Sequence, residues 1–465
     1  MPEVAGALEL DPAHRRGLQR KVIRTLITSQ ILSGLGMASG LAVGALLAED
    51  LSGTESLAGL GTTFQVLGGA LIAIPVARVM AARGRRPGLQ LGLALALVGA
   101  ALVVTAGVAR NFGLMLLGML LFGGGTSANS QSRYAAADLA LPQHRGRDLS
   151  FVVWATTIGS VLGPNLVGPG QAFAHALGLP GLAGSFLFSL AGFAAAFVVI
   201  NRLLRPDPLL TARALERADR EAAAERHTEP ARSVVTVPLG HAAEDGAALE
   251  PVDGVRPGQS GDGAEDHNGS LTRGLRVVRT NARARLGVLT IALGHVVMVS
   301  VMVMTPIHMS HGHADLEVIG FVISMHILGM YAFSPVIGAA VDRWGGPFVA
   351  ATGGAVLTLA SLLASQSMMG WSPLLLVALL LLGLGWSCTL ISGSTMLTSA
   401  VTAQERPATQ GLSEVFMGLA GAAGGLLAGV VVDRLGYGTL AMGAAVVGVA
   451  VVVLVAITAP RSARH

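Results

Sequence analysis

Charged residues are scarce in this chain of 465 residues. Asp, Glu, Lys and Arg together make up 12% of it, whereas a soluble globular domain carries about 25%. Apolar residues reach 52% and the mean hydropathy is +0.64. So few charges cannot cover a surface that meets water on every side. The composition therefore excludes an ordinary soluble domain and predicts a protein that lies largely within a lipid bilayer.

Two further absences narrow the class of protein. Cys388 is the one cysteine in the sequence, which excludes an internal disulfide framework. The sequence contains no phosphate-binding G-x-x-x-x-G-K-[ST] loop and no other enzyme signature. We therefore expect neither catalysis nor a bound cofactor, and no process driven by nucleotide hydrolysis.

The basic residues are spread along the chain, although the net charge is +4. They lie mostly at the ends of apolar segments and form no single patch, which argues against nucleic-acid binding. Lys and Arg gather on the cytoplasmic side of membrane proteins. This rule predicts a multi-pass protein of the cytoplasmic (inner) membrane, with both termini and the central polar linker in the cytoplasm.

Predominantly apolar segments of about 20 residues, long enough to cross a hydrocarbon core of about 30 Å, recur along the chain. They predict an all-α membrane protein with twelve transmembrane helices, arranged as two pseudo-symmetric six-helix bundles. The expected helices are 22–47, 57–80, 88–109, 112–138, 149–170, 181–204, 285–309, 316–341, 347–367, 372–400, 408–432 and 438–459.

A polar segment separates the two predicted bundles. It holds 13 of the 27 acidic residues, all between Asp207 and Asp266. Within it we expect an exposed helix at 212–226, a disordered stretch at 233–268 and an amphipathic helix on the inner leaflet at 271–285. The predicted organisation is a tail 1–21, a bundle 22–204, a linker 205–284, a bundle 285–460 and a tail 461–465.

A charged motif recurs between predicted helices. Residues 338–345 read Gly-Ala-Ala-Val-Asp-Arg-Trp-Gly, and a degraded copy at 77–86 has Ala81 in place of the acid. This pair of motifs, at equivalent places in the two halves, resembles the G-x-x-x-D-R-x-G signature of the major facilitator superfamily. The resemblance implies a transporter of twelve helices. Asp342 and Arg343 then form a charged hinge at a helix end, which gates the conformational change.

Other charged side chains lie in or beside the predicted spans. Arg133 and Asp138, near the end of the fourth helix, are expected to form an ion pair that locks one state. Glu414 is a carboxylate inside a span and a candidate for carrying a coupling proton. An ion pair with Arg406 or Arg147 is the simpler interpretation of Glu414.

Histidine and methionine concentrate on the seventh and eighth predicted helices. His295, Met298 and Met302 share one helix face, and His326 and Met330 share another. A polar group within a span usually faces a cavity with a function, and imidazole and thioether ligands favour Cu(I) over hard cations. These residues predict a copper site near the midplane. Further expected ligands are Met37 from the first half and an outer capture group of His308, Met309, His311 and His313.

The sequence Met298-x-x-x-Met302, followed on the next helix by His326-x-x-x-Met330, resembles the paired motifs of CcoA-like copper importers. The resemblance implies copper import into the cytoplasm by alternating access, with these four residues required. In that family the copper serves assembly of haem–copper respiratory oxidase. Copper is then the substrate and not a cofactor, and we expect the chain to act as a monomer surrounded by membrane lipid.

Three other interpretations stay open. A proton-coupled exporter of small organic molecules is favoured by Gly159-Ser-Val-Leu-Gly163-Pro164, which resembles a motif of proton-driven antiporters; an alternative is a packing kink. Such an exporter needs an aromatic-lined cavity, and aromatic residues are only 4% of the chain. A copper sensor that signals through the linker needs a binding motif that the linker lacks. The methionine stripe is also compatible with plain packing, since methionine is a common apolar filler.

Overall fold

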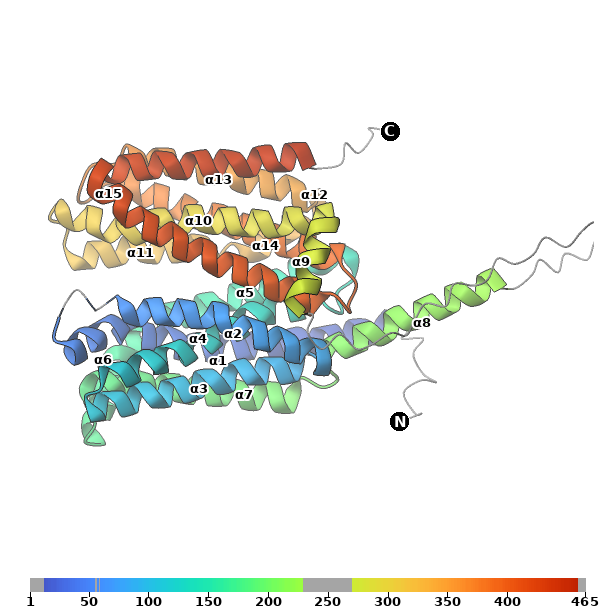
Figure 1. The fold of residues 1–465 in the computed structure, drawn as a ribbon, viewed down its shortest axis with the longest axis horizontal. Helices are drawn as coiled ribbons and strands as arrows, with labels where there is room; N and C mark the ends of the chain where they lie inside the picture. Colours follow the sequence, from blue (N-terminus) through green and yellow to red (C-terminus); the bar gives the residue numbers. More distant parts are fainter. Residues whose placement is uncertain (1–11, 55–56, 58, 229–269, 459–465) are drawn as a thin grey trace, which may run out of the picture.

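The computed structural model describes residues 12–54, 57, 59–228 and 270–458. Within these residues every regular element is a helix, and the helices form two layers that lie against each other (Figure 1). One layer comes from the N-terminal half of the chain and the other from the C-terminal half. The predicted disordered stretch 233–268, the predicted tail 461–465 and residues 1–11 of the predicted N-terminal tail lie outside the described residues.

The first layer contains a broken span. α5 and α6 meet at an angle of 61° around the 3₁₀ turn Pro164–Leu166. Proline has no N–H donor and interrupts the α-helical hydrogen-bond ladder, so the span breaks at the predicted Gly-Pro motif. The helices of this layer are α1 (Pro12–Ser52), α2 (Leu60–Arg83), α3 (Arg85–Ala109), α4 (Phe112–Ala136), α5 (Arg145–Leu162), α6 (Val167–Ala176) and α7 (Gly184–Leu203).

The second layer contains a turn hidden inside one long helix. Gly436 in α15 has φ 83°, a left-handed conformation that glycine adopts without strain, and it divides α15 into two helices. α11 and α12 follow each other within one span, Val318–Trp344. The helices of this layer are α10 (Ala282–His311), α11 (Leu316–Tyr331), α12 (Ser334–Trp344), α13 (Gly346–Ser365), α14 (Pro373–Ala400) and α15 (Arg406–Thr458).

The helices in the described residues follow the apolar segments of the sequence. Ten helical stretches are long and apolar enough to span a membrane, and the bent α5–α6 pair gives an eleventh. α15 counts as one of the ten, and Gly436 divides it into two helices near the predicted boundary between 408–432 and 438–459. The predicted fold is therefore confirmed. The largest difference in bounds is at α1, which begins at Pro12 rather than at residue 22 and so extends beyond the apolar run.

Close packing inside each layer depends on small residues, and each layer has its own apolar core. α5 crosses α1 where Gly159 lies against Gly34 and Gly163 lies against Ala38. A Cβ atom at Gly159 would lie 2.6 Å from the carbonyl carbon of Gly34, so a larger residue would force the two helices apart. The two layers touch each other chiefly through α2 with α15 and through α5 with α12.

The linker contributes α8 (Pro208–Thr228) and α9 (Ser270–Thr280). Both lie at the end of the molecule where α1 begins and α15 ends, which we call the linker end (Figure 1). α8 covers the predicted helix 212–226, but its first turns are not exposed, because Leu209 and Ala212 are buried in the core of the N-terminal layer. α9 differs from the predicted leaflet helix, because Leu275 and Val278 pack on protein, in a cluster that includes Val288 and Leu412. Its apolar side is thus covered by the C-terminal layer.

Candidate functional site

The paired methionine and histidine motifs lie inside the C-terminal layer. Met298 on α10 and Met330 on α11 are 7% and 8% exposed and belong to one apolar core cluster, against which Met302 packs. His326 on α11 is 1% exposed. All four residues therefore lie within one half of the molecule, and the methionines also serve its packing.

The two ring nitrogens of His326 differ in their surroundings. Its Nδ1 lies 2.9 Å from the carbonyl oxygen of Leu379 on α14. A carbonyl only accepts, so Nδ1 carries the proton and donates it, which leaves the Nε2 lone pair exposed to the interior. Nε2 is buried and has no hydrogen-bond partner among the described residues. This is the arrangement of a histidine ligand whose second nitrogen is oriented by a backbone carbonyl.

His295 on α10 is held differently. The indole Nε1–H of Trp386 on α14 donates to His295 Nδ1 at 3.0 Å. In a neutral imidazole the proton is then on Nε2, so neither nitrogen of His295 offers a lone pair to a metal in this conformation. Tyr331 completes the group, with its ring 5.8 Å from that of Trp386 in an edge-to-face arrangement. His295, Trp386 and Tyr331 form an aromatic cluster.

The predicted outer capture group is spread over different environments. His308 stacks on Tyr437 with a centroid distance of 4.1 Å and lies 3.4 Å from Ser367 Oγ. His311 and His313 are exposed. Met309 is fully buried in the core of the C-terminal layer, so it faces away from solvent at this mouth.

Met37 lies in the N-terminal layer, where its sulfur accepts a weak hydrogen bond from Thr126 Oγ1 of α4 at 3.7 Å. Among the residues that the structure describes, no three His, Cys, Asp or Glu side chains are grouped so as to hold a metal. A copper site here would therefore depend on thioether sulfur with one or two imidazoles.

A buried ion pair joins the two layers. Arg133 Nη2 on α4 donates to Glu414 Oε1 on α15 at 2.5 Å, and Arg133 Nε donates to Ser394 Oγ on α14 at 3.3 Å. The side chains of Arg133 and Glu414 are 7% and 6% exposed. Buried charges are stable only when paired, and removing one partner costs about 3–5 kcal/mol. Removal of either partner should therefore weaken the contact between the layers.

Two predicted pairings are wrong. Arg133 pairs with Glu414 and not with Asp138, because residues five apart point about 140° apart around a helix and α4 ends at Ala136 before Asp138 is reached. Glu414 pairs with neither Arg406 nor Arg147. Arg406 lies eight residues earlier on the same helix, about 12 Å away along its axis (~1.5 Å per residue).

The ion pair and the aromatic cluster both contact α14. Arg133 donates to Ser394 of α14, and Trp386 of α14 donates to His295. The Arg133 guanidinium also lies 4.7 Å from the ring centre of Tyr134. Such a group can bind a flat or anionic organic molecule through cation–π, stacking and ionic contacts.

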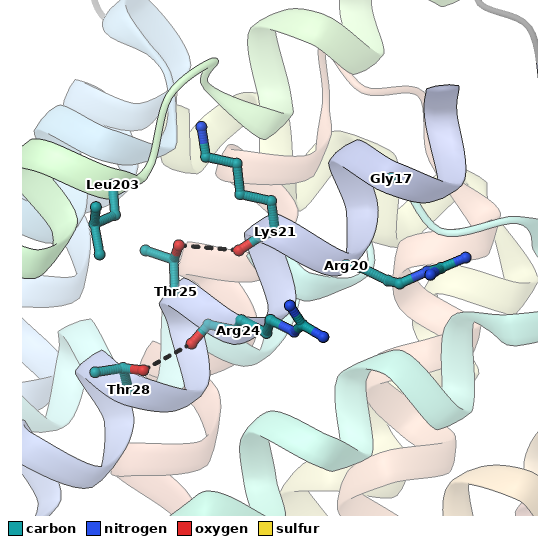
Figure 2. A pocket seen from close by; sticks show the side chains of 7 residues that line it. All are labelled: Gly17, Arg20, Lys21, Arg24, Thr25, Thr28 and Leu203. Carbon is teal, nitrogen blue, oxygen red and sulfur yellow. Dashed lines mark hydrogen bonds between the residues drawn. The ribbon is translucent and has the colours of Figure 1, made fainter. Parts of the chain in front are cut away.

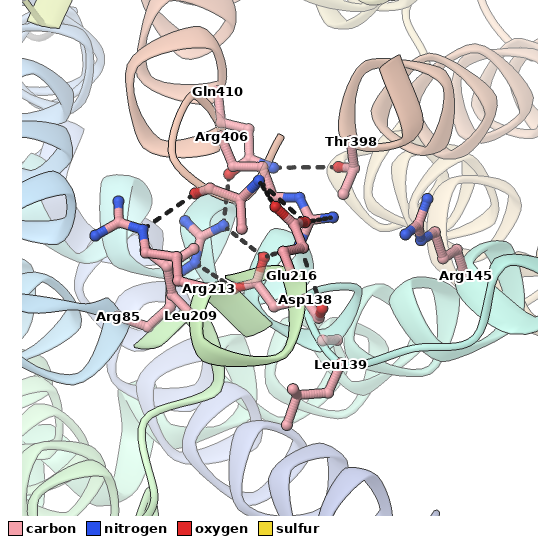
Figure 3. A network of polar contacts seen from close by, with 12 residues as sticks. Arg85, Asp138, Leu139, Arg145, Leu209, Arg213, Glu216, Thr398, Arg406 and Gln410 are labelled. Carbon is pink, nitrogen blue, oxygen red and sulfur yellow. Dashed lines mark hydrogen bonds and ion pairs between the residues drawn. The ribbon is translucent and has the colours of Figure 1, made fainter. Parts of the chain in front are cut away.

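A second buried network closes the linker end (Figure 3). Arg85 Nε of α3 donates to Asp138 at 2.7 Å, and Arg85 Nη2 donates to Gln410 Oε1 of α15 at 2.6 Å. Arg406 Nη1 donates to the carbonyl oxygen of Asp138 at 3.2 Å. The side chains of Arg85 and Asp138 have no exposed surface. These contacts cross between the layers and hold them together at this end.

Asp342 makes the other inter-layer contact of the linker end. Its two carboxylate oxygens accept from the backbone N–H groups of Gly146 and Arg147, at 2.7 and 2.8 Å. These N–H groups begin α5, where the helix dipole favours a negative charge. Arg343 is exposed. Asp342 thus acts as a helix cap across the interface, and its partner is a helix terminus rather than an arginine.

The degraded copy of this motif is supplemented by the linker. Ala81 stands where the motif has its acidic residue. Arg213 of α8 donates to the carbonyl oxygens of Ala81 and Ala403, at 2.9 and 3.4 Å. Glu216 of α8 accepts from the backbone N–H of Ala403 at 3.1 Å and lies 3.7 Å from Arg406. The first turns of α8 therefore bridge α2 to the start of α15.

Sequence reasoning missed the roles of the linker and of the aromatic cluster. The acidic linker was expected only to be solvated, yet Asp207 accepts from the backbone N–H of Arg86 at 2.7 Å at the start of α3. A signal was present, since Ala81 marks a lost acid and the acids of 207–216 follow the first bundle directly. Trp386 carried no comparable signal, because its neighbours His295 and Tyr331 lie far from it in sequence.

Long apolar helices in two layers, with buried charges joining the layers, define a polytopic membrane protein. A sequence model of the Major Facilitator Superfamily matches residues 26–313 and 286–465. The chain is 35% identical to the transporter YdeG of Bacillus subtilis (strain 168) over 431 residues, which cover 93% of this chain and 90% of YdeG. The chain belongs to the major facilitator superfamily. Members of this superfamily are carriers and not enzymes, which confirms the expectation from the sequence that this protein is not an enzyme.

Other similar proteins carry names that mention a substrate. The riboflavin transporter RfnT of Brucella anthropi is 27% identical, with 90% of this chain and 91% of RfnT covered. The crystal structure of the human organic anion transporter MFSD10 matches with a TM-score of 0.67 at 19% identity, covering 94% of this chain and 99% of that one. A bacterial homologue of the iron transporter ferroportin matches with a TM-score of 0.68 at 13% identity, covering 95% of this chain and 100% of that one. The two structures show a shared fold.

Proposed function

We propose that this protein is a proton-coupled carrier that moves small organic solutes across the cytoplasmic membrane by alternating access. The observation that carries the proposal is the buried pair of Arg133 and Glu414, 2.5 Å apart, which joins the two layers. A carboxylate inside a membrane domain is costly to bury and usually marks a functional site. Glu414 is such a group, and its partner belongs to the other half of the molecule.

The pair supplies a coupling mechanism. While Glu414 is ionised, Arg133 is neutralised and the layers are held together. When Glu414 takes up a proton, Arg133 becomes a buried charge without a partner, and the contact loses its ionic stabilisation. The linker end then opens more readily, and Arg133 becomes available to an anionic group of the solute. Proton binding and solute binding are linked because both act on one interface.

The proposed solute is a flat organic molecule or a small organic anion. His295, Trp386 and Tyr331 supply rings, and Arg133, which donates to Ser394 on the same helix as Trp386, supplies a cation. This grouping supports the organic alternative despite the low overall content of aromatic residues. The printed names of two similar proteins, a riboflavin transporter and an organic anion transporter, point to the same chemical class. Riboflavin is the first probe that we would use.

The proposal is tested with the purified protein in liposomes that contain a pH-sensitive dye. A panel of organic anions and flavins is added, and proton movement is recorded together with solute movement. Glu414→Gln should abolish solute-dependent proton movement while downhill solute exchange persists. Asp433→Asn, an exposed acid on the same helix, is the matched control and should leave both intact. Solute movement without proton movement in the wild type would overturn the proposal.

Copper import, with Met298, Met302, His326 and Met330 as ligands, is the second candidate. The observation that favours it is the buried Nε2 lone pair of His326, which has no partner among the described residues and lies one helical turn from Met330. Soft sulfur and nitrogen donors favour Cu(I). The other predicted copper ligands support this candidate less, because Met309 is buried and Nδ1 of His295 accepts a hydrogen bond from Trp386.

Copper import predicts metal accumulation in copper-starved cells that lack their own importer. The wild-type chain should raise cell copper, and His326→Ala and Met302→Ala should remove the gain at matched membrane expression. Met368→Ala, a methionine that is 78% exposed, is the matched control. Equal copper in all strains, or less copper with the wild type, would contradict import and leave His326 as a packing residue.

A further inference from the structure

Two hollows flank the first helix at the linker end, outside the transport site. One, of about 430 Å³, lies between α1 and α5 and is lined by Arg15, Arg20, Arg24 and Arg147. The other, of about 380 Å³, lies between α1 and the end of α7 and is lined by Arg20, Lys21 and Arg24 (Figure 2). Arg20 and Arg24 therefore belong to both hollows.

The described residues balance only part of the positive charge in these hollows. Among them, the acid that lines the first hollow is Asp148, which accepts from Gln19 at 2.8 Å and lies 3.5 Å from Arg147. None of the described residues that line the second hollow is acidic. Arg20 and Arg24 are exposed and have no carboxylate partner in the described part of the chain. Like charges placed so close together repel each other. A bound anion would reduce this repulsion at the start of α1.

Each hollow also has an apolar wall. Ile27 and Phe151 line the first, and Leu203, which is 48% exposed, lines the second. Figure 2 shows Arg20 and Arg24 extending from the same side of α1, while Leu203 faces the helix from the end of α7. A ligand that fits must therefore be anionic at one end and apolar at the other.

The depth of the site matches the boundary of a bilayer. α1 has 41 residues, a length of about 60 Å at ~1.5 Å per residue, which is twice the thickness of a hydrocarbon core of about 30 Å. The apolar run begins at Thr25, directly after Arg24. The arginines therefore lie at the level of the lipid headgroups, and Ile27 and Leu203 lie beside the first part of the acyl chains.

We propose that these two hollows bind the headgroups of anionic phospholipids, with Arg20 and Arg24 shared between them. The phosphodiester pairs with the guanidinium groups, whose planar donors suit phosphate oxygens. The acyl chains follow the apolar walls along α1. Because α1 packs on both α5 and α7, a bound lipid holds these helices together at the linker end.

The proposal is tested by native mass spectrometry and melting curves of the full chain in neutral detergent. Dioleoylphosphatidylglycerol is compared with dioleoylphosphatidylcholine, which has the same acyl chains, and with sodium phosphate. Phosphatidylglycerol should bind and raise the melting temperature, and the other two should do neither. The double variant Arg20→Gln/Arg24→Gln should bind phosphatidylglycerol roughly 25-fold more weakly, about fivefold for each charge removed.

Arg83→Gln, an exposed arginine at the same end on α2, is the matched control and should bind as the wild type does. Equal binding of phosphatidylcholine would show that the headgroup charge is not recognised. Equal stabilisation by sodium phosphate would identify a free-anion site instead of a lipid site. Full binding by the double variant would overturn the assignment of Arg20 and Arg24, and in that case these residues only set the orientation of the helix in the membrane.

Discussion

The two inter-layer contacts at the linker end occupy equivalent places in the two halves but are built differently. On the α5–α12 side, the carboxylate of Asp342 caps the start of α5 directly. On the α2–α15 side, Ala81 stands where the acid is expected, and Arg213 and Glu216 of the linker bridge the gap. The first contact is a property of the bundles alone. The second contact depends on α8, a linker helix that directly follows α7 of the N-terminal bundle.

This difference has a consequence for gating. A cap made by one carboxylate is broken whenever the two layers separate, whatever the linker does. A bridge made by α8 can be released by moving the linker alone. The α2–α15 contact is also supported by the buried network of Arg85, Asp138 and Arg406. The two sides therefore differ in how strongly they are held and in what controls them.

The largest expected effect comes from breaking the buried network. Asp138→Asn leaves Arg85 and Arg406 without their carboxylate, and we expect the free energy of unfolding to fall by about 3–5 kcal/mol. Chemical unfolding in detergent micelles measures the change. Asp50→Asn is the control, because Asp50 pairs with exposed Arg110 and its removal should cost less than about 1 kcal/mol. Equal losses in the two variants would contradict the importance of the buried network.

A smaller effect is expected on the α5–α12 side. Asp342→Asn removes the charge that caps α5, a change of about 1–2 kcal/mol, and the open population should rise about 5–30-fold. A cysteine at Ser150, which is buried beside Gly338, reports opening through its rate of thiol labelling in a Cys388→Ser background. Arg343→Gln, which alters an exposed neighbour, is the control. Unchanged labelling in Asp342→Asn would show that this cap does not hold the interface.

The smallest effect sharpens the comparison between the two sides. Glu216 is 33% exposed, so Glu216→Gln should cost less than about 1 kcal/mol. Ala81→Asp supplies the acid that the α2–α15 side lacks. In that background, Glu216→Gln should lower the free energy of unfolding by still less. A double-mutant cycle on the melting temperature measures this coupling. Additive effects of the two substitutions would mean that α8 does not stand in for the missing acid.

Much of the fold was predictable because long apolar runs have few alternatives in a bilayer. The breaks were also predictable in part, since Pro164 marks one of them. Pairings across the layers were not. Arg85 and Asp138 are 53 residues apart, and Arg133 and Glu414 are 281 apart, and only the packing of helices brings such partners together. Charge spacing along one helix led instead to the incorrect pairing of Arg133 with Asp138.

The candidate site shows the same limit. His326 was singled out from its place within a span, and its buried Nε2, which has no partner among the residues that the structure describes, fits that reasoning. His295 was chosen by helical spacing, which gave no sign that Trp386 would donate to its Nδ1. Trp386 lies 91 residues further along the chain. A periodic pattern identifies a face of a helix, whereas its partners come from the helices packed against that face.

The central claim is that protonation of Glu414 releases the linker end. Spin labels at Arg83 and Gln404, exposed positions in the two layers, measure the opening as a distance distribution in a Cys388→Ser background. At one fixed pH we expect longer distances in Glu414→Gln, which mimics the protonated side chain, than in the wild type, because the Arg133–Glu414 pair is lost. Asp433→Asn, an exposed acid on the same helix, is the control and should keep the distances of the wild type. The same distance distribution in Glu414→Gln and in the wild type would contradict this account.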